Sequence, residues 1–119
     1  MKLSIVIPCY NEEGTIVKLL SKVREVDLGD VEKEIIVVDD YSTDRTRELL
    51  QSNNTYDKLL LHDRNQGKGA ALRTGFAAVT GDIVIVQDAD LEYDPNDYRS
   101  LIEPIIAGEA QVEIGRAHV

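Results

Sequence analysis

Residues 83–95 read IVIVQDADLEYDP, and this stretch decides how the rest of the chain is interpreted. Four β-branched residues run directly into carboxylates at alternate positions, Asp88, Asp90 and Glu92. A short, continuous apolar run is typical of a strand that is buried on both faces of a parallel sheet. Acids that follow such a strand either remain in solvent or surround a cation, and this stretch alone leaves both interpretations open.

The strand expected at 81–88 is one of four. The other apolar runs are 2–8 (KLSIVIP), 33–40 (KEIIVVDD) and the weaker 57–63 (DKLLLHD). Helical signals lie between and after these runs. The first is the i, i+3, i+4, i+7 spacing of Ile16, Leu19, Leu20 and Val23, and the second is the group of possible caps before Leu49 and Leu50. The third is the small-residue face of Ala71, Gly75 and Ala78, and the fourth is the segment 95–107, which opens with Pro95. The alternation predicts an α/β fold with four mostly parallel strands and flanking helices.

Polar residues gather where these strands end. The segments are PCYNEE (8–13), VDDYSTD (38–44) and QDADLE (87–92). In open α/β sheets, ligands bind beyond the carboxyl ends of the strands. The sequence therefore predicts that all three segments lie on one rim, which forms the binding site.

Composition narrows the class of protein. The chain has 119 residues and a net charge of -9, from 22 acidic and 13 basic residues, which argues against a nucleic-acid partner. The single cysteine, Cys9, excludes a disulfide framework and is compatible with a reducing, cytoplasmic compartment. No apolar run approaches the ~20 residues of a membrane span. We therefore expect the chain to be soluble and cytoplasmic.

Three groups of residues have chemistry that suits a ligand. Asp88 and Asp90 can converge on one Mg²⁺ or Mn²⁺, which typically takes one or two carboxylates plus substrate phosphates. Asp39 or Asp40 can accept hydrogen bonds from a base or ribose, and Asp40 or Ser42 can instead cap the next helix.

The strand end at 8–12 offers Tyr10 for stacking on a base and Glu12 for its polar edge. Glu12 and Glu13 can equally be first-turn acids favoured by the helix dipole. A catalytic role for Cys9 is not expected, because neither His62 nor His118 belongs to a motif that places it nearby.

The glycine-rich segment 65–71 (NQGKGAA) does not match either standard phosphate loop. A P-loop requires Gly at the position of His62 and Ser or Thr at that of Gly69, and the dinucleotide pattern requires Gly at Leu72. Lys68 and a helix N-terminus could still face an anion.

Taken together, these motifs resemble glycosyltransferase family 2, the inverting enzymes of GT-A fold. The segments that carry the resemblance are SIVIPCYNEEGTI (4–16), IIVVDDYSTDRT (35–46), NQGKGAALRTG (65–75) and DIVIVQDADLEYDP (82–95). Their order and spacing are those of the family, and they span nearly all of 3–98. Within the family, the residues of these motifs are most similar to those of the polyprenyl-phosphate sugar transferases of the dolichyl-phosphate mannose synthase type. Arg45 stands where many members have Gly.

The resemblance implies a Rossmann-like, nucleotide-sugar-binding half of a GT-A domain. It implies the following roles: Pro8, Tyr10 and Glu12 at the nucleoside, Val37 and Asp39 as the second wall of that pocket, Asp88, Ala89 and Asp90 at the metal and diphosphate, Glu92 as a further metal ligand, and Lys68 near the donor. The cofactor implied is Mg²⁺ or Mn²⁺. No catalytic base can be assigned.

The implied reaction is metal-dependent, inverting transfer from a UDP- or GDP-sugar to an acceptor, with a polyprenyl phosphate expected. Two alternatives remain open: a polysaccharide or other hydroxyl acceptor, and a non-catalytic nucleotide- or metal-binding fragment. A signalling receiver domain is disfavoured, because its acidic pair should follow the first strand.

The resemblance also predicts how the chain is organised. Residues 1–112 are expected to be the N-terminal, donor-binding part of a catalytic domain, with the acceptor half and any membrane helices further on. The whole protein could then work at the cytoplasmic face of a membrane. The last seven residues, 113–119 (EIGRAHV), match the translation of a widely used sequencing adapter, so we predict that they are a non-native tail.

Overall fold

The computed structural model describes residues 1–90 and 94–106. Its strands are β1 (Lys2–Cys9), β2 (Glu32–Asp39), β3 (Lys58–Leu61) and β4 (Ile83–Val86). Its helices are α1 (Ile16–Glu25), α2 (Thr46–Ser52), α3 (Lys68–Ala78), a 3₁₀ turn η1 (Pro95–Asp97) and α4 (Tyr98–Ile106). Strands and helices therefore alternate as predicted. The last helix differs from the prediction, because Pro95 begins a 3₁₀ turn and the α-helix starts only at Tyr98.

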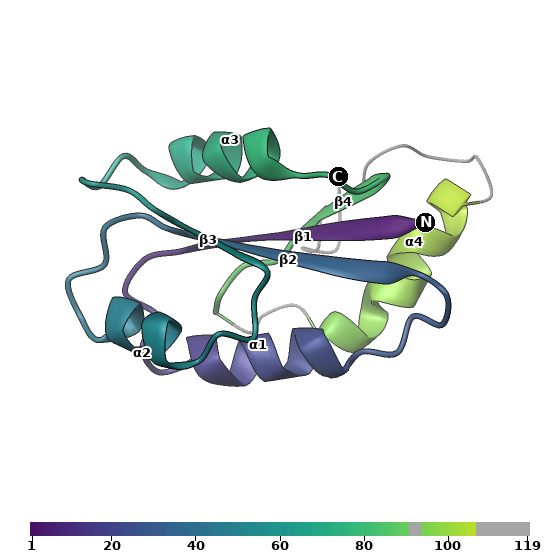
Figure 1. The fold of residues 1–119 in the computed structure, drawn as a ribbon, viewed down its shortest axis with the longest axis horizontal. Helices are drawn as coiled ribbons and strands as arrows, with labels where there is room; N and C mark the ends of the chain where they lie inside the picture. Colours follow the sequence, from purple (N-terminus) through teal and green to yellow (C-terminus); the bar gives the residue numbers. More distant parts are fainter. Residues whose placement is uncertain (91–93, 107–119) are drawn as a thin grey trace.

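The four strands form one parallel sheet in the order β3-β2-β1-β4. Cys9 pairs with Asp39 in the register of β1 and β2, and Asp39 pairs with Leu61 in that of β2 and β3. The carboxyl ends of these strands therefore meet at one edge (Figure 1). The predicted fold class, an α/β structure with four parallel strands and flanking helices, is confirmed.

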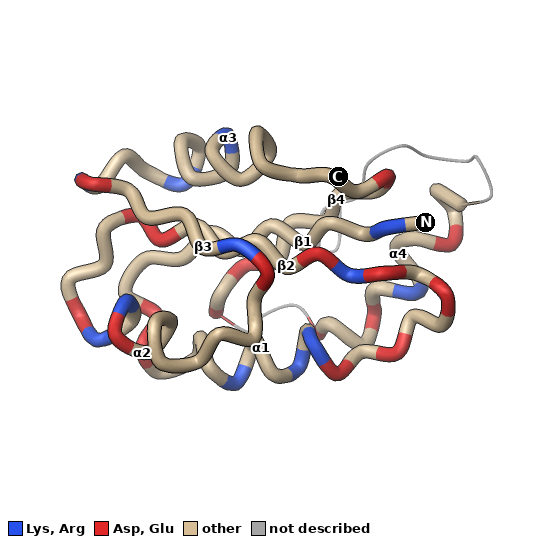
Figure 2. Tube along the Cα trace, viewed as in Figure 1, with Lys and Arg blue, Asp and Glu red and all other residues tan. Residues whose placement is uncertain are grey.

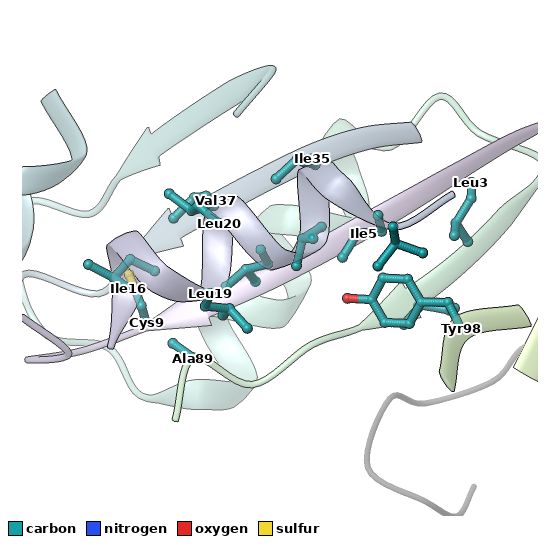
Figure 3. Packing of buried hydrophobic residues seen from close by; sticks show 14 of the residues in the cluster. Leu3, Ile5, Cys9, Ile16, Leu19, Leu20, Ile35, Val37, Ala89 and Tyr98 are labelled. Carbon is teal, nitrogen blue, oxygen red and sulfur yellow. The ribbon is translucent and has the colours of Figure 1, made fainter. Parts of the chain in front are cut away.

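Helices cover both faces of the sheet, which explains why the strands are apolar throughout. In Figure 1, α1, α2 and α4 lie on one side of the sheet and α3 lies on the other. The larger core cluster joins α1 to the sheet, and Tyr98 of the last helix packs into it with no exposed surface (Figure 3). The smaller cluster lies under α3 and contains Ile36, Val38 and Ala71.

Helix α3 lies unusually close to the sheet because its inner face is made of small residues. A Cβ atom built on Gly75 would lie 2.4 Å from Val6 Cγ1 and 3.3 Å from Val38 Cγ2. Ala71, one turn earlier, is buried against the same strands. The prediction that this face packs on the sheet is confirmed, and the close approach sets the position of the first residues of α3.

Acidic and basic residues are interspersed along the described trace (Figure 2). Within residues 1–90 and 94–106, no helix has both the length and the hydropathy that crossing a bilayer requires. Glu92 and the predicted tail, 113–119, lie outside the described residues.

Candidate functional site

A cavity of about 460 Å³ opens at the carboxyl edge of the sheet. It is lined by Pro8, Cys9, Tyr10, Glu12, Asp40, Asn65, Gly67, Lys68, Ala71, Asp88, Ala89 and Asp90. These residues come from the ends of β1, β2 and β4 and from the start of α3. The volume lies within the ~300–1,000 Å³ that is usual for small-molecule sites. The rim predicted from the three polar strand ends is therefore a single cavity.

The end of β1 supplies one wall. Tyr10 keeps 45% of its surface exposed, so the ring is available to a ligand. The next residue, Asn11, has φ of 53° and is held by the loop after β2, because its Oδ1 accepts hydrogen bonds from the Thr43 and Asp44 amides at 2.8 and 3.3 Å. The Asn11 amide donates in turn to Ser42 Oγ at 2.9 Å. These hydrogen bonds hold the loop after β1 and the loop after β2 together.

Thr15 joins this wall to the acidic segment after β4. Its hydroxyl donates to the Ala89 carbonyl oxygen at 2.6 Å and also lies 3.0 Å from Glu12 Oε2. A residue predicted to contact the nucleoside is thereby linked to the residue between Asp88 and Asp90. The segment 4–16 contains Thr15, but the sequence assigned it no role, because a threonine just before a helix is common.

Val37 and Asp39 do not line the cavity. Val37 is fully buried in the larger core cluster, on the α1 side of the sheet (Figure 3). Asp39 is also fully buried, and its carboxylate accepts hydrogen bonds from Arg47 Nε at 2.5 Å and from the Ser42 amide at 2.9 Å. Side chains two apart in a strand share a face, so both point away from the α3 side. Their predicted contact with a nucleoside stays a prediction.

Asp40 is the acid of this pair that lines the cavity. Its Oδ1 accepts from the Gln66 amide and its Oδ2 from the Gly67 amide, both at 2.8 Å. Burial alone would raise the pKa of Asp40, but these hydrogen bonds and the one from His62 outweigh it and lower the pKa. The alternative role of Asp40 or Ser42 as a helix cap is wrong, since α2 begins after Arg45 and Asp44 accepts from the Thr46 amide at 2.9 Å.

His62 contacts Asp40 but does not itself line the cavity. The sequence alone did not assign it to the site. It is buried, its Nδ1 lies 2.8 Å from Asp40 Oδ1, and its Nε2 lies 2.8 Å from Thr74 Oγ1 on α3. The sequence offered a weak signal only, a histidine at the end of a predicted strand. The resulting chain from Thr74 through His62 and Asp40 to Gly67 holds the loop that begins α3.

The loop before α3 places Lys68 next to the acidic segment after β4, residues 88–90. Gly67 adopts φ of 93°, which side chains rarely tolerate, and Lys68 is the first residue of α3. Lys68 Nζ lies 2.5 Å from Asp88 Oδ1. The carboxylate of Asp88 therefore already attracts a cation in this structure.

The carboxylates at the cavity suit a divalent ion whose remaining coordination positions are filled by a bound ligand. Among residues 1–90 and 94–106, no group of three or more His, Cys, Asp or Glu side chains is arranged to hold a metal by itself. Mg²⁺ and Mn²⁺ usually take one or two protein carboxylates and fill other positions with phosphate and water. Asp88 and Asp90 on the cavity wall provide such a pair.

Cys9 lines the cavity in an environment that disfavours the nucleophilic thiolate form. Burial raises the pKa of its thiol, and Asp39 raises it further. A thiol with a raised pKa carries little thiolate at neutral pH, so it is unreactive. The expectation that Cys9 has no catalytic role agrees with this environment.

A parallel α/β sheet with acids, a lysine and a helix N-terminus around one cavity at its carboxyl edge is the arrangement in which open α/β proteins bind their ligands. The sequence profile of glycosyl transferase family 2 matches residues 4–119, and the chain therefore belongs to that family. The dolichol-phosphate mannosyltransferase of Pyrococcus furiosus is 37% identical over 121 residues, which cover 100% of this chain and 34% of the relative. The chain thus spans about a third of that relative's length.

Solved structures of other proteins share this fold. The structure of S. aureus TarS 1–349 in complex with UDP matches with a TM-score of 0.76 and 27% identity, covering 90% of this chain and 32% of that one. Glucosyl-3-phosphoglycerate synthase from Mycobacterium tuberculosis, in complex with Mn²⁺, UDP and glucosyl-3-phosphoglycerate, matches with a TM-score of 0.75 and 31% identity, covering 91% and 40%.

Proposed function

We propose that the protein containing this chain transfers a sugar from a nucleotide-sugar donor to an acceptor, and that residues 1–112 form its donor-binding part. The observation that carries the proposal is the cavity, which brings Tyr10, Lys68 and Asp88 together at the carboxyl edge of the sheet. The match to UDP-bound relatives of the same fold supports it.

Each side chain has a role in donor binding under this proposal. Tyr10 stacks on the base and Glu12 accepts a hydrogen bond from its polar edge. Lys68 and the amides at the start of α3 face the diphosphate, since a helix N-terminus favours anions. Tyr10 and Glu12 can make these contacts with either uracil or guanine.

We propose that Asp88 and Asp90 hold Mg²⁺ or Mn²⁺, with Glu92 as a further ligand. When bound, the ion would supply Lewis-acid stabilisation of the departing nucleoside diphosphate. The Mn²⁺ in the complex of glucosyl-3-phosphoglycerate synthase supports a divalent ion in this cavity. The cavity holds the donor so that the acceptor attacks its anomeric carbon in line with the leaving diphosphate, and this displacement inverts the configuration.

The acceptor that we favour is a polyprenyl phosphate. The similarity to a dolichol-phosphate mannosyltransferase over the whole chain supports it. A phosphate oxygen is already anionic, so it needs no strong general base, and no base is assigned among the described residues. Since such an acceptor is embedded in lipid, the whole protein would work at the cytoplasmic face of a membrane.

A hydroxyl acceptor is the second candidate. It is favoured by the likeness to glucosyl-3-phosphoglycerate synthase, which was solved with phosphoglyceric acid. A hydroxyl nucleophile needs a carboxylate or another base within hydrogen-bond reach. Incubating the whole protein with labelled UDP- and GDP-sugars and either polyprenyl phosphate or a saccharide distinguishes the two acceptors by which product is labelled.

The metal assignment is tested by Asp90→Ala. We expect Mn²⁺ to strengthen the binding of UDP or GDP to the unaltered chain, and the variant to lose most of this enhancement because one of the proposed carboxylate ligands is missing. Isothermal titration with and without Mn²⁺ measures both affinities. Exposed Asp82→Ala, at the opposite edge of the sheet, is the control for the loss of one negative charge. An equal enhancement by Mn²⁺ in Asp90→Ala and in the unaltered chain would contradict the assignment.

We also propose that 113–119 is not native, because this heptapeptide matches the translation of a sequencing adapter, although the family match extends to residue 119. Sequencing the source locus tests this, and a genomic stop codon directly after Val119 with the heptapeptide intact would refute it.

A further inference from the structure

The ion pair between Lys68 and Asp88 joins two elements that both line the cavity. Lys68 begins α3, and Asp88 follows β4. Their charged atoms lie 2.5 Å apart, and the side chains are 45% and 11% exposed, respectively. A half-exposed ammonium group therefore neutralises a carboxylate that is nearly buried.

A nearly buried carboxylate is unfavourable without a cation beside it. Lys68 supplies that cation in this structure. A divalent ion bound through the same Asp88 oxygen would meet the ammonium at close range, and two positive charges repel each other there. Lys68 and a metal ion therefore compete for Asp88.

The start of α3 provides Lys68 with another partner once a donor enters. The first amides of a helix have no acceptor within the helix and attract anions. Gly67 and Gly69 flank Lys68, and a Cβ on Gly67 would meet no heavy atom within 4 Å, so the space beside the lysine is open. A diphosphate held at these amides would lie within reach of the flexible lysine stem.

We propose that Lys68 is an exchangeable internal cation, which neutralises Asp88 in the absence of ligand and passes to the diphosphate when the nucleotide binds. This inference rests on the proposed metal site at Asp88 and Asp90. It makes metal binding and nucleotide binding mutually dependent: the nucleotide removes the competitor of the metal, and the metal releases Lys68 for the nucleotide. Such coupling must be equal in both directions.

Lys68→Met tests the proposal because the two affinities should change in opposite directions. Mn²⁺ alone should bind to the variant at least about fivefold more tightly than to the unaltered chain, the lower range of typical coupling. UDP and GDP in the absence of metal should bind more weakly. The electron paramagnetic resonance signal of free Mn²⁺ measures the first affinity, and isothermal titration measures the second.

Two further variants separate exchange from general electrostatics. Arg73→Gln removes the same charge from an exposed position of the same helix and should leave Mn²⁺ affinity almost unchanged. Lys68→Arg keeps the charge and should retain most of the competition. A gain in Mn²⁺ affinity from Arg73→Gln as large as that from Lys68→Met would overturn the proposal. Weaker binding of both Mn²⁺ and the nucleotides to Lys68→Met would also overturn the proposal, because a purely structural role of Lys68 predicts that result.

If Asp88 and Asp90 do not bind a metal ion at all, the Mn²⁺ titrations give a different result. Asp88→Asn would then bind Mn²⁺ as the unaltered chain does, with and without nucleotide, and both the metal site and the exchange would be rejected. If Asp88→Asn loses Mn²⁺ but Lys68→Met gains no affinity for it, the metal site stands and only the exchange is rejected. Circular dichroism melts confirm that each variant is folded.

Discussion

At the scale of single residues, Asp40 connects the sheet to the loop that carries Lys68. Its two oxygens accept the Gln66 and Gly67 amides, and His62 contacts it from the buried side. A carboxylate with several hydrogen bonds to its charged form has a lowered pKa, as Asp40 does. The position of Lys68 therefore depends on a network behind the cavity and not only on the residues that line it.

His62→Ala is the residue-scale prediction. The variant removes one of the two hydrogen bonds to Asp40 Oδ1 and leaves only the Gln66 amide there. A hydrogen bond to a charged group contributes about 1.5–3 kcal/mol, so we expect the free energy of unfolding to fall by about that much. We also expect UDP and GDP to bind more weakly, whereas uridine and guanosine, which lack the diphosphate, bind as before. Urea denaturation and isothermal titration measure these quantities.

Thr74→Val is the matched control for His62→Ala, because it removes only the far hydrogen bond of the histidine. Its effects should have the same direction and a smaller size. Equal losses of nucleoside and nucleotide affinity in His62→Ala would show that the histidine supports the whole cavity and not the loop before α3.

At the scale of elements, Glu34 joins three segments at the opposite edge of the sheet. It accepts hydrogen bonds from Ser4 Oγ on β1 at 2.7 Å and from the amide and hydroxyl of Thr80, after α3, at 2.9 and 2.6 Å. Lys58 Nζ on β3 lies 3.4 Å from it. This cluster fixes the end of α3 and the start of β4 relative to the middle of the sheet.

Glu34 should make stability depend on acidic pH. Burial alone would raise its pKa, but the hydrogen bonds from Thr80 and Ser4 and the one from Lys58 lower it from 4.5 to about 2. Because the pKa is lower in the folded state, the contribution is present above pH 4.5 and is lost as the pH falls toward 2. The shift corresponds to about 3 kcal/mol.

The measurement is the free energy of unfolding in urea from pH 6 to pH 2. Glu34→Gln should be less stable than the unaltered chain at pH 6, and the difference should shrink as the pH falls. Exposed Glu25→Gln is the control. A difference that stays constant over this range would exclude Glu34 as a source of the pH dependence.

At the scale of the whole molecule, the cavity lies between elements from both faces of the sheet. Tyr10 and Glu12 precede α1, whereas Gly67 and Lys68 begin α3 on the other face. A ligand in the cavity therefore contacts segments that unfolding would separate. It should stabilise the fold by mass action, since the unfolded chain lacks the site.

UDP or GDP with Mn²⁺ should raise the thermal midpoint of the chain. At a nucleotide concentration a hundred times the Kd, the stabilisation is about 2.7 kcal/mol, which corresponds to about ten degrees for a domain of this size. Differential scanning calorimetry with UDP, GDP and CDP, each with Mn²⁺, measures the shift. The nucleotide with the largest shift identifies the base, and no shift with any of the three would contradict the proposed donor site.

The sequence by itself was sufficient to predict the alternating strands and helices, the parallel sheet and the polar carboxyl edge. These features depend on local signals: runs of β-branched residues, the helical spacing of Ile16 to Val23, and the small face around Gly75. The family followed from the order of its motifs. The prediction that segments 8–13, 38–44 and 87–92 lie on one rim also succeeded for their described residues, because parallel strands place their carboxyl ends at one edge.

Only the tertiary structure decided which acid of the pair after β2 lines the cavity. Asp39 turns toward Arg47 and Asp40 toward the loop before α3, and adjacent residues of a strand point to opposite faces, so the outcome depends on which helix covers which face. The contacts of His62 with Asp40 and Thr74, of Thr15 with Ala89, and of Lys68 with Asp88 likewise join segments distant in sequence. No local pattern specifies such pairs, because side chains meet only after the sheet has assembled and the helices have packed on it.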